Sequence, residues 1–446
     1  MKRVIIFWAL AIISLSQALA QDSLVIKNLR EAITLAFKEN TDVVNSQLEI
    51  ESKRQRNLEV LSDGLPQIKA TGKVTDNLVL PKTIVPAERF GGTPGSLIAI
   101  EFGVPYNVEG GILARQTLFD KSFLIGLKAA RSSVQLSELS SDKTREDVAM
   151  QVASVYYNIL LCTKQIQYLR KQLESYHSLY HVAEIQLQAG VSKKSDMDRI
   201  QVNQTNLETA LLNYENLYQQ QMYDLKLLLG INTNAPLAIN DSITEASLIA
   251  DSTSFDIHNR ADWQIIQKQG ELQQLEIKQK RAGYMPVISL NAQYTEDYYG
   301  KELKPFDASW YNSSFLFVTL DIPIFDGFKK KAQVAQSNIA WKETQNRQMF
   351  LESTANKEIA DAQNKLTYSI SRLNSQVKNI DLASEVFQET TQEYKQGTSS
   401  MSDLLNAENS LLESQRQYLG ALADMILAEL SLQKAKGTLL PNLHVK

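Results

Sequence analysis

Residues 127–189 and 328–396 contain neither glycine nor proline, and this feature most limits the possible folds. Glycine and proline are the residues that most often end a helix. At about 1.5 Å per residue, an uninterrupted helix over 328–396 would be on the order of 100 Å long. Because this length exceeds the width of an ordinary globular domain, the sequence predicts long helices that pack against neighbours along their whole extent.

Each of these stretches ends in a similar short turn, AGVSKKSD at 189–196 and QGTSSMSD at 396–403. Three pairs of residues match at a constant separation of 207 positions: Gly190 with Gly397, Ser195 with Ser402, and Asp196 with Asp403. A glycine can adopt the left-handed conformation that ends a helix. We expect Ser195 or Ser402, with the aspartate that follows, to cap the next helix. Each turn is therefore predicted to be the tip of a helical hairpin.

The segment after the second turn carries two apolar stripes that repeat every seven residues. The paired apolar positions are Leu404/Leu405, Leu411/Leu412, Tyr418/Leu419 and Met425/Ile426, and small residues recur at Ala407, Ser414, Ala421, Ala428 and Ala435. Two stripes with small residues between them favour a helix that contacts neighbours on both sides. A single buried stripe in an ordinary helical bundle is the alternative.

A different pattern precedes each long helix. After Pro66 and after Pro286, apolar and polar residues alternate over QIKATGKVTDN and VISLNAQYTED, and each of these strands is followed by a loop and a return strand. Such alternation over about ten residues is typical of a strand in a transmembrane barrel, with one apolar and one polar face. A soluble hairpin with one buried face shows the same alternation, so both interpretations stay open.

Residues 1–20 are predicted to be a cleavable secretory signal, with Lys2 and Arg3 before an apolar run and a small-residue exit at Ala20. A short membrane anchor is the alternative, although the run is short for spanning a bilayer. Acidic residues outnumber basic ones, which argues against nucleic acid as a partner. Cys162 is the only cysteine, so no disulfide can form within the chain.

The pattern predicts two copies of one architecture: helix, strand, strand, long helix, tip turn, helix. The first copy, 21–230, has a leading helix at 29–61, strands at about 66–80 and 106–118, a long helix at 120–188, a tip turn at 189–195 and a helix at 196–229. A linker follows at 231–256. The second copy, 257–437, has a leading helix at 257–282, strands at about 286–298 and 313–324, a long helix at 327–395, a tip turn at 396–401 and a helix at 402–437, before a tail at 438–446.

This ordered set of motifs resembles the TolC family of outer-membrane efflux proteins (outer membrane factors). The resemblance rests on the duplicated architecture, the strand-to-helix junction IPIFDGF at 322–328, and the Gly-x4-Ser-Asp spacing of the two tips. It implies an α+β, predominantly helical fold. In that fold, four strands per chain build the transmembrane β-barrel of a homotrimer, with twelve strands in all, and an antiparallel α-helical coiled-coil tunnel extends into the periplasm.

The resemblance also implies a function and partners. The protein would be the exit duct of a tripartite efflux or type I secretion system in the cell outer membrane. Its periplasmic tips would open when a periplasmic adaptor (membrane fusion) protein and an inner-membrane transporter dock. Outer-membrane lipid would be a partner, and nucleic acid would not. On physical grounds, four strands cannot close a barrel, since even small ones need about eight. Two or three copies would suffice, and only the resemblance selects three.

The resemblance assigns two groups of site residues. The periplasmic gate would contain Asp403, Asn406, Asp196 and Tyr394. The adaptor-docking tips would contain Gly190, Ser192, Ser195, Gly397, Ser399, Ser400 and Ser402. Two positions depart from the family pattern, because Ser399 replaces an expected arginine and Asn406 replaces a second acidic residue. Asp403 therefore has two interpretations: an anionic constriction at the threefold axis, or a simple helix cap.

The sequence shows no pattern that requires catalysis or a cofactor, so no enzyme activity is predicted. His177 and His181, with Glu174 and Glu184, have a metal-like spacing, but four residues along one helix cannot all reach one ion, and no metal is expected. The rival function is a periplasmic coiled-coil adaptor or structural protein without a pore. Two full hairpins plus two amphipathic strand pairs argue against that rival.

Two surface features near the second strand pair have open interpretations. Lys329, Lys330 and Lys331 open the second long helix and would either contact inner-leaflet phosphates or be merely solvated. The aromatic residues Tyr298, Tyr299, Trp310 and Tyr311 flank the loop between the strands. They suit a membrane interface, and loop packing alone is the alternative.

Overall fold

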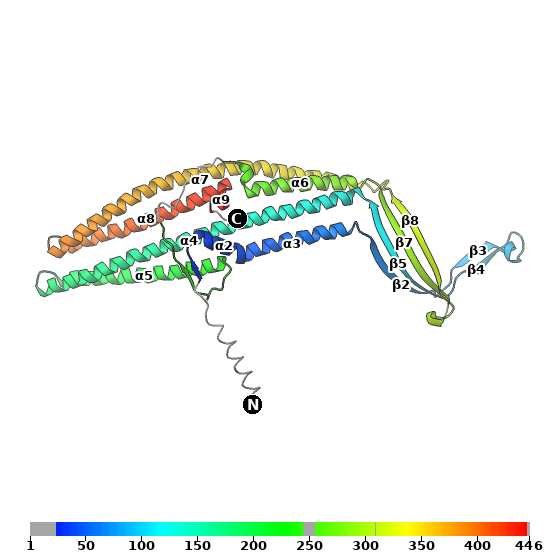
Figure 1. The fold of residues 1–446 in the computed structure, drawn as a ribbon, viewed down its shortest axis with the longest axis horizontal. Helices are drawn as coiled ribbons and strands as arrows, with labels where there is room; N and C mark the ends of the chain where they lie inside the picture. The colour runs from blue at the N-terminus through cyan, green and yellow to red at the C-terminus, as the bar shows by residue number, and fades with distance from the viewer. Residues whose placement is uncertain (1–23, 244–254, 308, 444–446) are drawn as a thin grey trace, which may run out of the picture. The chain divides into compact units, whose positions relative to one another are not determined.

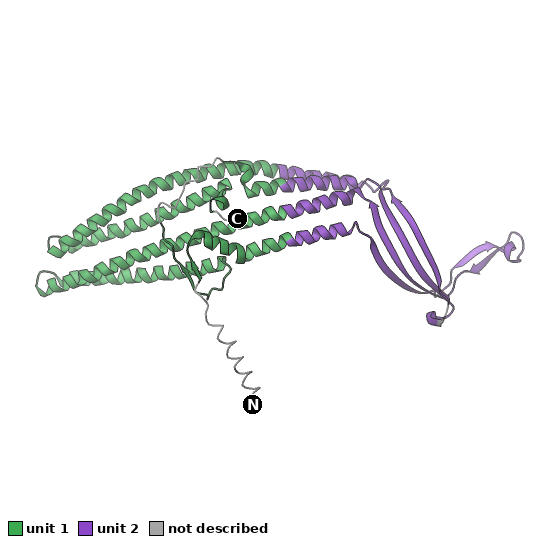
Figure 2. Ribbon diagram, in the orientation of Figure 1, with its two compact units in different colours: residues 1–50, 136–267, 346–446 green, residues 51–135, 268–345 purple. Residues whose placement is uncertain are grey.

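The computed structural model describes residues 24–243, 255–307 and 309–443 (Figure 1). The chain divides into two compact units (Figure 2). Unit 1 comprises residues 1–50, 136–267 and 346–446, and unit 2 comprises residues 51–135 and 268–345. The expected signal peptide, residues 1–20, lies outside the described residues.

The two long helices are α4 (Lys121–Gln188) and α7 (Lys329–Gln396), each of 68 residues. They lie close to the bounds expected from the absence of glycine and proline. A short turn follows each one and leads into a tip helix, α5 (Lys194–Leu228) or α8 (Met401–Lys436). In the described part of the chain, no helix is both long enough and apolar enough to cross a bilayer.

The first leading segment differs from the single helix expected over 29–61. It forms α2 (Leu29–Glu39) and α3 (Thr41–Ser62), because Asn40 between them has an extended backbone with ψ of 131°. The Asn40 side chain accepts a hydrogen bond from the Asp42 N–H over 2.9 Å and so caps α3. The second leading segment forms α6 (Ala261–Ala282) after a short 3₁₀ turn.

The core of unit 1 lies between its four longest helical segments. Two clusters of buried apolar side chains join α4, α5, α7 and α8, and the larger one also includes α2. Leu404, Leu411 and Leu419 are buried in these clusters, and the small residues Ala407, Ala421 and Ala428 are buried between neighbouring helices. Helix α8 is therefore covered on more than one side, which is why its small residues recur at a fixed spacing.

Unit 2 contains an antiparallel sheet with the strand order β2-β5-β7-β8. Its strands are β2 (Gln67–Asp76), β5 (Tyr106–Phe119), β7 (Val287–Gly300) and β8 (Tyr311–Asp321). Ladders join each neighbouring pair, and β2 and β8 stand at the two edges (Figure 1). Strand β8, the second return strand, begins and ends slightly earlier than the strand expected at 313–324.

The strand register places most apolar residues of the four strands on one face, since directly opposed residues share a face. These residues are Ile68, Ala70 and Val74 on β2, Val108, Ile112 and Ala114 on β5, Ile288, Leu290 and Ala292 on β7, and Leu316, Val318 and Leu320 on β8. The other face is mainly polar and hydrogen-bonded: Asn291 donates to Thr319 Oγ1 over 2.8 Å. The apolar exceptions on this polar face are Leu113, Val287, Phe315 and Phe317.

The loop of the first strand pair contains a hairpin that the sequence analysis did not foresee. Strands β3 (Lys82–Pro86) and β4 (Leu97–Glu101) pair antiparallel, with an ion pair of 3.2 Å between Lys82 and Glu101. Prolines and glycines in this loop obscured the alternation on which the other strands were recognised.

The linker expected at 231–256 takes part in a small sheet. Strand β6 (Leu237–Ile239) pairs in parallel with β1 (Leu24–Ile26). Residues 244–254 of this linker lie outside the described residues. The expected tail at 438–446 contains the short helix α9 (Leu439–Asn442), and residues 444–446 are likewise outside the described part.

Candidate functional site

The two tip turns end α4 and α7 with the same backbone geometry. Gly190 and Gly397 have φ angles of 74° and 78°, a region that disfavours residues with a Cβ atom. The residue after each glycine, Val191 or Thr398, donates its N–H to the carbonyl five residues earlier, over 2.9 and 3.0 Å. This hydrogen bond satisfies one of the free carbonyls at a helix end. Glycine is therefore the helix stop at both tips.

The capping prediction for Ser195 and Ser402 is wrong, because both lie inside the first helical turn. Helices α5 and α8 begin after the extended residue three positions beyond each glycine, which is Lys193 or Ser400. Lys193 makes no side-chain cap. The Ser400 hydroxyl instead accepts from the Asp403 N–H over 3.2 Å, while the Asp403 carboxylate accepts from the Ser400 N–H over 3.2 Å and from its hydroxyl over 2.6 Å.

Two of the four expected gate residues lie in one neighbourhood. Tyr394, in the last turn of α7, is 5% exposed and packs in the core cluster of the tip region. Burial raises the pKa of Tyr394, and the charge of Asp196 on α5 raises it further. The Ser192 side chain lowers this pKa. In the described part of the chain, no group meets the geometry of a hydrogen bond with the Tyr394 hydroxyl. The first tip therefore faces the end of α7.

The other two gate residues are exposed on the first turns of α8. Asp403 makes its hydrogen bonds to Ser400, and the backbone carbonyl of Asn406 accepts from the Ser410 hydroxyl over 2.9 Å. The remaining tip residue, Ser399, is half-buried beside Ser400. The described chain thus shows Asp403 acting as a cap within a single copy.

The far ends of the tip helices carry a second pair of glycines that the sequence analysis missed. Gly230 and Gly437 end α5 and α8 with φ of 69° and 71°, and they too are 207 positions apart. A Cβ atom on Gly230 would lie 2.1 Å from the Glu39 carbonyl oxygen, and one on Gly437 would lie 2.7 Å from that of Asn259. Only glycine fits either site, and the shared spacing was the signal that could have revealed them.

Two buried polar side chains anchor these same helix ends. Asn40 donates through Nδ2 to the Leu228 carbonyl over 2.7 Å, and Arg260 donates through Nη1 to the Ala435 carbonyl over 3.0 Å. Leu228 and Ala435 are again 207 positions apart. The two anchors differ in charge, since a neutral amide holds α5 and a guanidinium holds α8.

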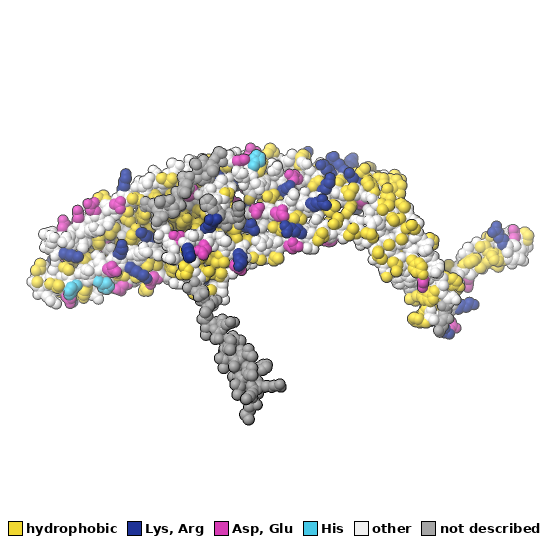
Figure 3. Space-filling model, in the orientation of Figure 1, with side chains coloured by type: hydrophobic (Ala, Val, Ile, Leu, Met, Phe, Trp, Pro, Cys, Tyr) yellow, Lys and Arg dark blue, Asp and Glu magenta, His cyan; other side chains and the backbone are white. Residues whose placement is uncertain are grey.

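The apolar face of the sheet is open to its surroundings in the described chain. Ile68, Ile112 and Val318 are all exposed, and Leu316 on the edge strand is 73% exposed. Hydrophobic side chains gather over these strands in Figure 3. A continuous exposed apolar area of this kind marks a surface for lipid or for another protein.

The aromatic residues of the second loop contact one another. The ring centroids of Tyr298 and Trp310 lie 6.1 Å apart, and those of Tyr299 and Tyr311 lie 6.3 Å apart. Trp310 donates its indole N–H to the Pro305 carbonyl over 2.9 Å. These contacts fix the rings at the end of the β7–β8 hairpin.

Comparison with known proteins decides the family. The family model described as outer membrane efflux protein matches residues 32–231 and 257–438. The chain belongs to this family. Among curated relatives, this family member is 20% identical over 344 residues to the outer membrane protein TolC of Vibrio cholerae, covering 74% of this chain and 77% of the relative. It is 22% identical over 412 residues to the probable outer membrane lipoprotein SilC of Salmonella typhimurium, covering 90% and 84%.

Solved structures share the fold of this family member. A crystal structure of CusC matches with a TM-score of 0.74 at 20% identity, covering 91% of each chain. The crystal structure of VceC from Vibrio cholerae matches with a TM-score of 0.70 at 18% identity, covering 92% of this chain and 96% of that one. The resemblance noted in the sequence is confirmed, and the protein is an outer-membrane efflux protein.

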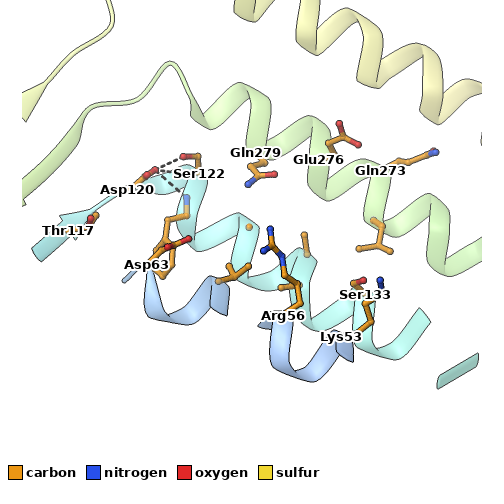
Figure 4. A pocket seen from close by; sticks show the side chains of 16 residues that line it. Lys53, Arg56, Asp63, Thr117, Asp120, Ser122, Ser133, Gln273, Glu276 and Gln279 are labelled. Carbon is orange, nitrogen blue, oxygen red and sulfur yellow. Dashed lines mark hydrogen bonds between the residues drawn. The ribbon is translucent and has the colours of Figure 1, made fainter. Parts of the chain in front are cut away.

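A groove of unit 2 in this family member lies among α3, α4 and α6, with a volume of about 680 Å³ (Figure 4). Its charged lining residues are Lys53, Arg56, Asp63, Asp120 and Glu276. Asp120 caps α4 by accepting from the Ser122 N–H over 2.8 Å.

The histidines considered as metal ligands lie elsewhere, and within the described ranges no three histidine, cysteine or acidic residues are grouped to hold a metal.

Glu408 on α8 is a buried carboxyl that the sequence analysis missed. It is 3% exposed, and its Oε1 accepts a hydrogen bond of 3.2 Å from Gln172 on α4. Burial raises the pKa of Glu408 to about 7. The burial of Glu408 could not be recognised from its neighbours in the sequence, because its hydrogen-bond partner Gln172 is on α4, far away in the chain.

Replacing Glu408 should change how the stability of the protein depends on pH. Between its ordinary pKa and about 7, the folded protein holds the proton while the unfolded chain has lost it, so stability falls as pH rises through this window. Glu408→Gln should therefore raise the melting temperature at about pH 8 and change it little at about pH 4.5. Glu413→Gln is the control, since Glu413 is exposed and hydrogen bonds from Gln417 and Arg416 lower its pKa. Identical shifts for both variants would contradict the burial argument.

Proposed function

We propose that this chain forms a homotrimeric channel-tunnel, the exit duct of a tripartite efflux or type I secretion system. The observation that carries this proposal is the continuous apolar face of a four-stranded sheet whose edge strands β2 and β8 have no partner strand in the described chain. Unpaired edges are templates for pairing with another chain. Four strands are too few to close a barrel, so pairing β8 of one copy with β2 of the next would close it.

A second surface supports association between copies. Helix α7 exposes apolar side chains at helical spacing on one face, among them Phe350, Tyr368, Leu382 and Val386. A helix with apolar residues on an outer face is normally covered by a neighbour. We assign that neighbour to an adjacent copy, and the number of copies, three, comes from the family. The equal turn geometries and the 207-position spacing support two internal repeats in each copy.

The sheet is proposed to span the membrane with its apolar face toward lipid. Adjacent residues of β7 offer a matched test, because Ala292 lies on the apolar face and Gln293 on the polar face. Ala292→Arg should cost about 2–4 kcal/mol of barrel stability if its site is near the bilayer midplane, whereas Gln293→Arg should cost little. Heat-dependent mobility of the assembled protein on a gel measures the difference. Equal effects at both positions would mean that neither face contacts lipid.

The helical tips are proposed to form the periplasmic gate and to dock the adaptor. Asp403, Asn406, Asp196 and Tyr394 would surround the constriction, and docking of an adaptor and an inner-membrane transporter would open it. The docking surface would consist of the exposed polar tips around Gly190 and Gly397. Related proteins are channels rather than enzymes, and we assign this chain no catalysis, cofactor or metal.

Asp403 allows a specific test of the gate. If three copies bring this carboxylate toward a common axis, the ring should attract cations, and Asp403→Asn should weaken cation preference and polyvalent-cation block in planar bilayers. If Asp403 only completes the capping box with Ser400, the variant should lose a little stability and conduct as before. Unchanged selectivity in an inserted trimer would remove Asp403 from the gate.

The alternative function, a periplasmic adaptor or structural protein without a pore, shares the helical hairpins. It does not explain the exposed apolar face of the sheet or the two unpaired edges. Cell fractionation combined with heat-modifiability on a gel separates the two. A heat-modifiable oligomer in the outer-membrane fraction that conducts ions in bilayers supports the channel, and a soluble monomer would overturn it.

A further inference from the structure

The segment at residues 322–328 joins β8 to α7 and exposes its apolar side chains. Ile324 is 95% exposed, Phe325 is 76% exposed and Phe328 is 66% exposed. They follow directly on the exposed apolar residues of β8, including Leu320. The apolar surface of the sheet therefore continues to the first turn of α7.

The backbone of this segment holds its aromatic rings in place. Phe328 has a φ angle of 66° and follows Gly327 with φ of 65°, and among the described residues Phe328 alone has a positive φ without being a glycine. This conformation is unfavourable for an aromatic residue and usually marks a functional constraint. The rings of Phe325 and Phe328 pack edge to face with centroids 5.4 Å apart. Asp326 closes the turn by accepting from the Lys330 N–H over 3.1 Å.

Basic side chains cluster at this junction. The residues at the start of α7 and the end of α6 are Lys329, Lys330, Lys331, Lys280 and Arg281. Lys330 Nζ lies 3.3 Å from the Asp326 carboxylate and 5.7 Å from the Tyr284 ring centroid, and Lys331 Nζ lies 6.0 Å from the Phe328 ring centroid. Lys329 is exposed. Lysine and arginine side chains gather beside hydrophobic ones in this part of Figure 3.

We propose that Lys329, Lys330, Lys331, Phe325, Phe328 and Tyr284 form a junction surface that binds anionic phospholipid in the membrane leaflet nearest the helices. Basic clusters directly beside a membrane-spanning segment attract anionic headgroups, and aromatic rings favour the headgroup level. The continuous apolar surface of β8 fixes the depth of these groups, since it would be covered by acyl chains. This inference rests on the proposed channel function, in which the sheet spans the outer membrane.

The test uses the full chain reconstituted in vesicles of phosphatidylethanolamine with a minor share of phosphatidylglycerol, then extracted with its surrounding lipid. Phosphatidylglycerol should be enriched around the wild-type protein, and added salt should reduce the enrichment. Lys329→Gln, Lys330→Gln and Lys331→Gln in one chain should lower the enrichment, by about fivefold for each lysine replaced. The matched control replaces Lys342, Lys365 and Lys378, which are also exposed on α7, and should behave as wild type.

Further variants and controls of this lipid experiment distinguish its possible results. Arginine at the same three positions keeps the positive charge and should retain the enrichment. If the triple glutamine variant does not assemble, Lys329→Gln alone, at an exposed side chain, should still lower the enrichment about fivefold. Absence of enrichment around a conducting wild-type channel would overturn this inference alone, whereas failure to insert and conduct would overturn the proposed function. Displacement of the lipid by inorganic phosphate would indicate a soluble-anion site and also overturn it. Unchanged enrichment around an assembled glutamine variant would also overturn the inference.

Discussion

Arg260→Ala is expected to lower the free energy of unfolding by about 1–3 kcal/mol, because it leaves the Ala435 carbonyl and two partly exposed carboxylates without the buried guanidinium that bonds them. The Arg260 side chain is 9% exposed and bonds Asp262 through two nitrogens, over 3.0 and 2.7 Å. It also bonds Glu358 on α7 over 2.9 Å and the Ala435 carbonyl of α8 over 3.0 Å. Removing it would disconnect the start of α6 from the end of α8 and from the middle of α7, and denaturant unfolding of the purified protein measures the loss.

Two controls separate this effect from ordinary loss of an ion pair. Arg416→Ala removes an exposed pair with Glu413 and should cost about 0–1 kcal/mol. Adding Asp262→Ala to Arg260→Ala should cost less than the sum of the single changes, since the partner charge disappears as well. Strict additivity of the two free-energy losses would show that the network around Arg260 contributes little to stability. A loss of stability for Arg260→Ala no larger than that for Arg416→Ala would show the same.

Gly190→Pro or Gly397→Pro is expected to abolish export while the assembled barrel persists. Proline is restricted to φ near −65° and has no N–H, whereas these glycines have φ of 74° and 78° and donate N–H bonds of 3.0 Å to the preceding helical turn. The helix would continue or unravel at the tip, so the docking surface would be lost. Cellular accumulation of a fluorescent efflux substrate, beside oligomer content on a gel, measures the two effects.

Asparagine is the matched control at these tips. A Cβ atom at Gly190 or Gly397 would meet nothing within 4 Å, so only the backbone conformation limits the choice of residue. Asparagine tolerates the left-handed conformation better than other residues with a side chain. Gly397→Asn should therefore retain most export. Normal export by the proline variants would show that the tips do not dock the adaptor.

The features predicted well from sequence are those that depend on local pattern. The long helices α4 and α7 followed from the absence of glycine and proline, and the apolar face of each of the strands β2 and β7 followed from the alternation of apolar and polar residues. The helix stops at Gly190 and Gly397 also followed from residue type, because few other residues adopt that conformation.

The features missed depend on partners that are distant in the chain. Asn40 breaks the leading helix because it bonds Leu228, and Glu408 is buried because α4 and α8 meet there.

The caps at the tips were placed two residues too late, since the sequence does not state how many extended residues follow the glycine. The β3–β4 hairpin escaped notice because its short strands lack polar alternation.

The unpaired edge strands β2 and β8 have a consequence for cells that produce two versions of this chain. Under the proposed assembly, each copy contributes one edge to each neighbour, so folding of the sheet finishes only when copies meet. A subunit with one damaged edge still offers its intact edge and enters the ring, where it leaves a gap. The fraction of intact rings then falls as the cube of the wild-type share, and such a mutation would be dominant over the normal gene.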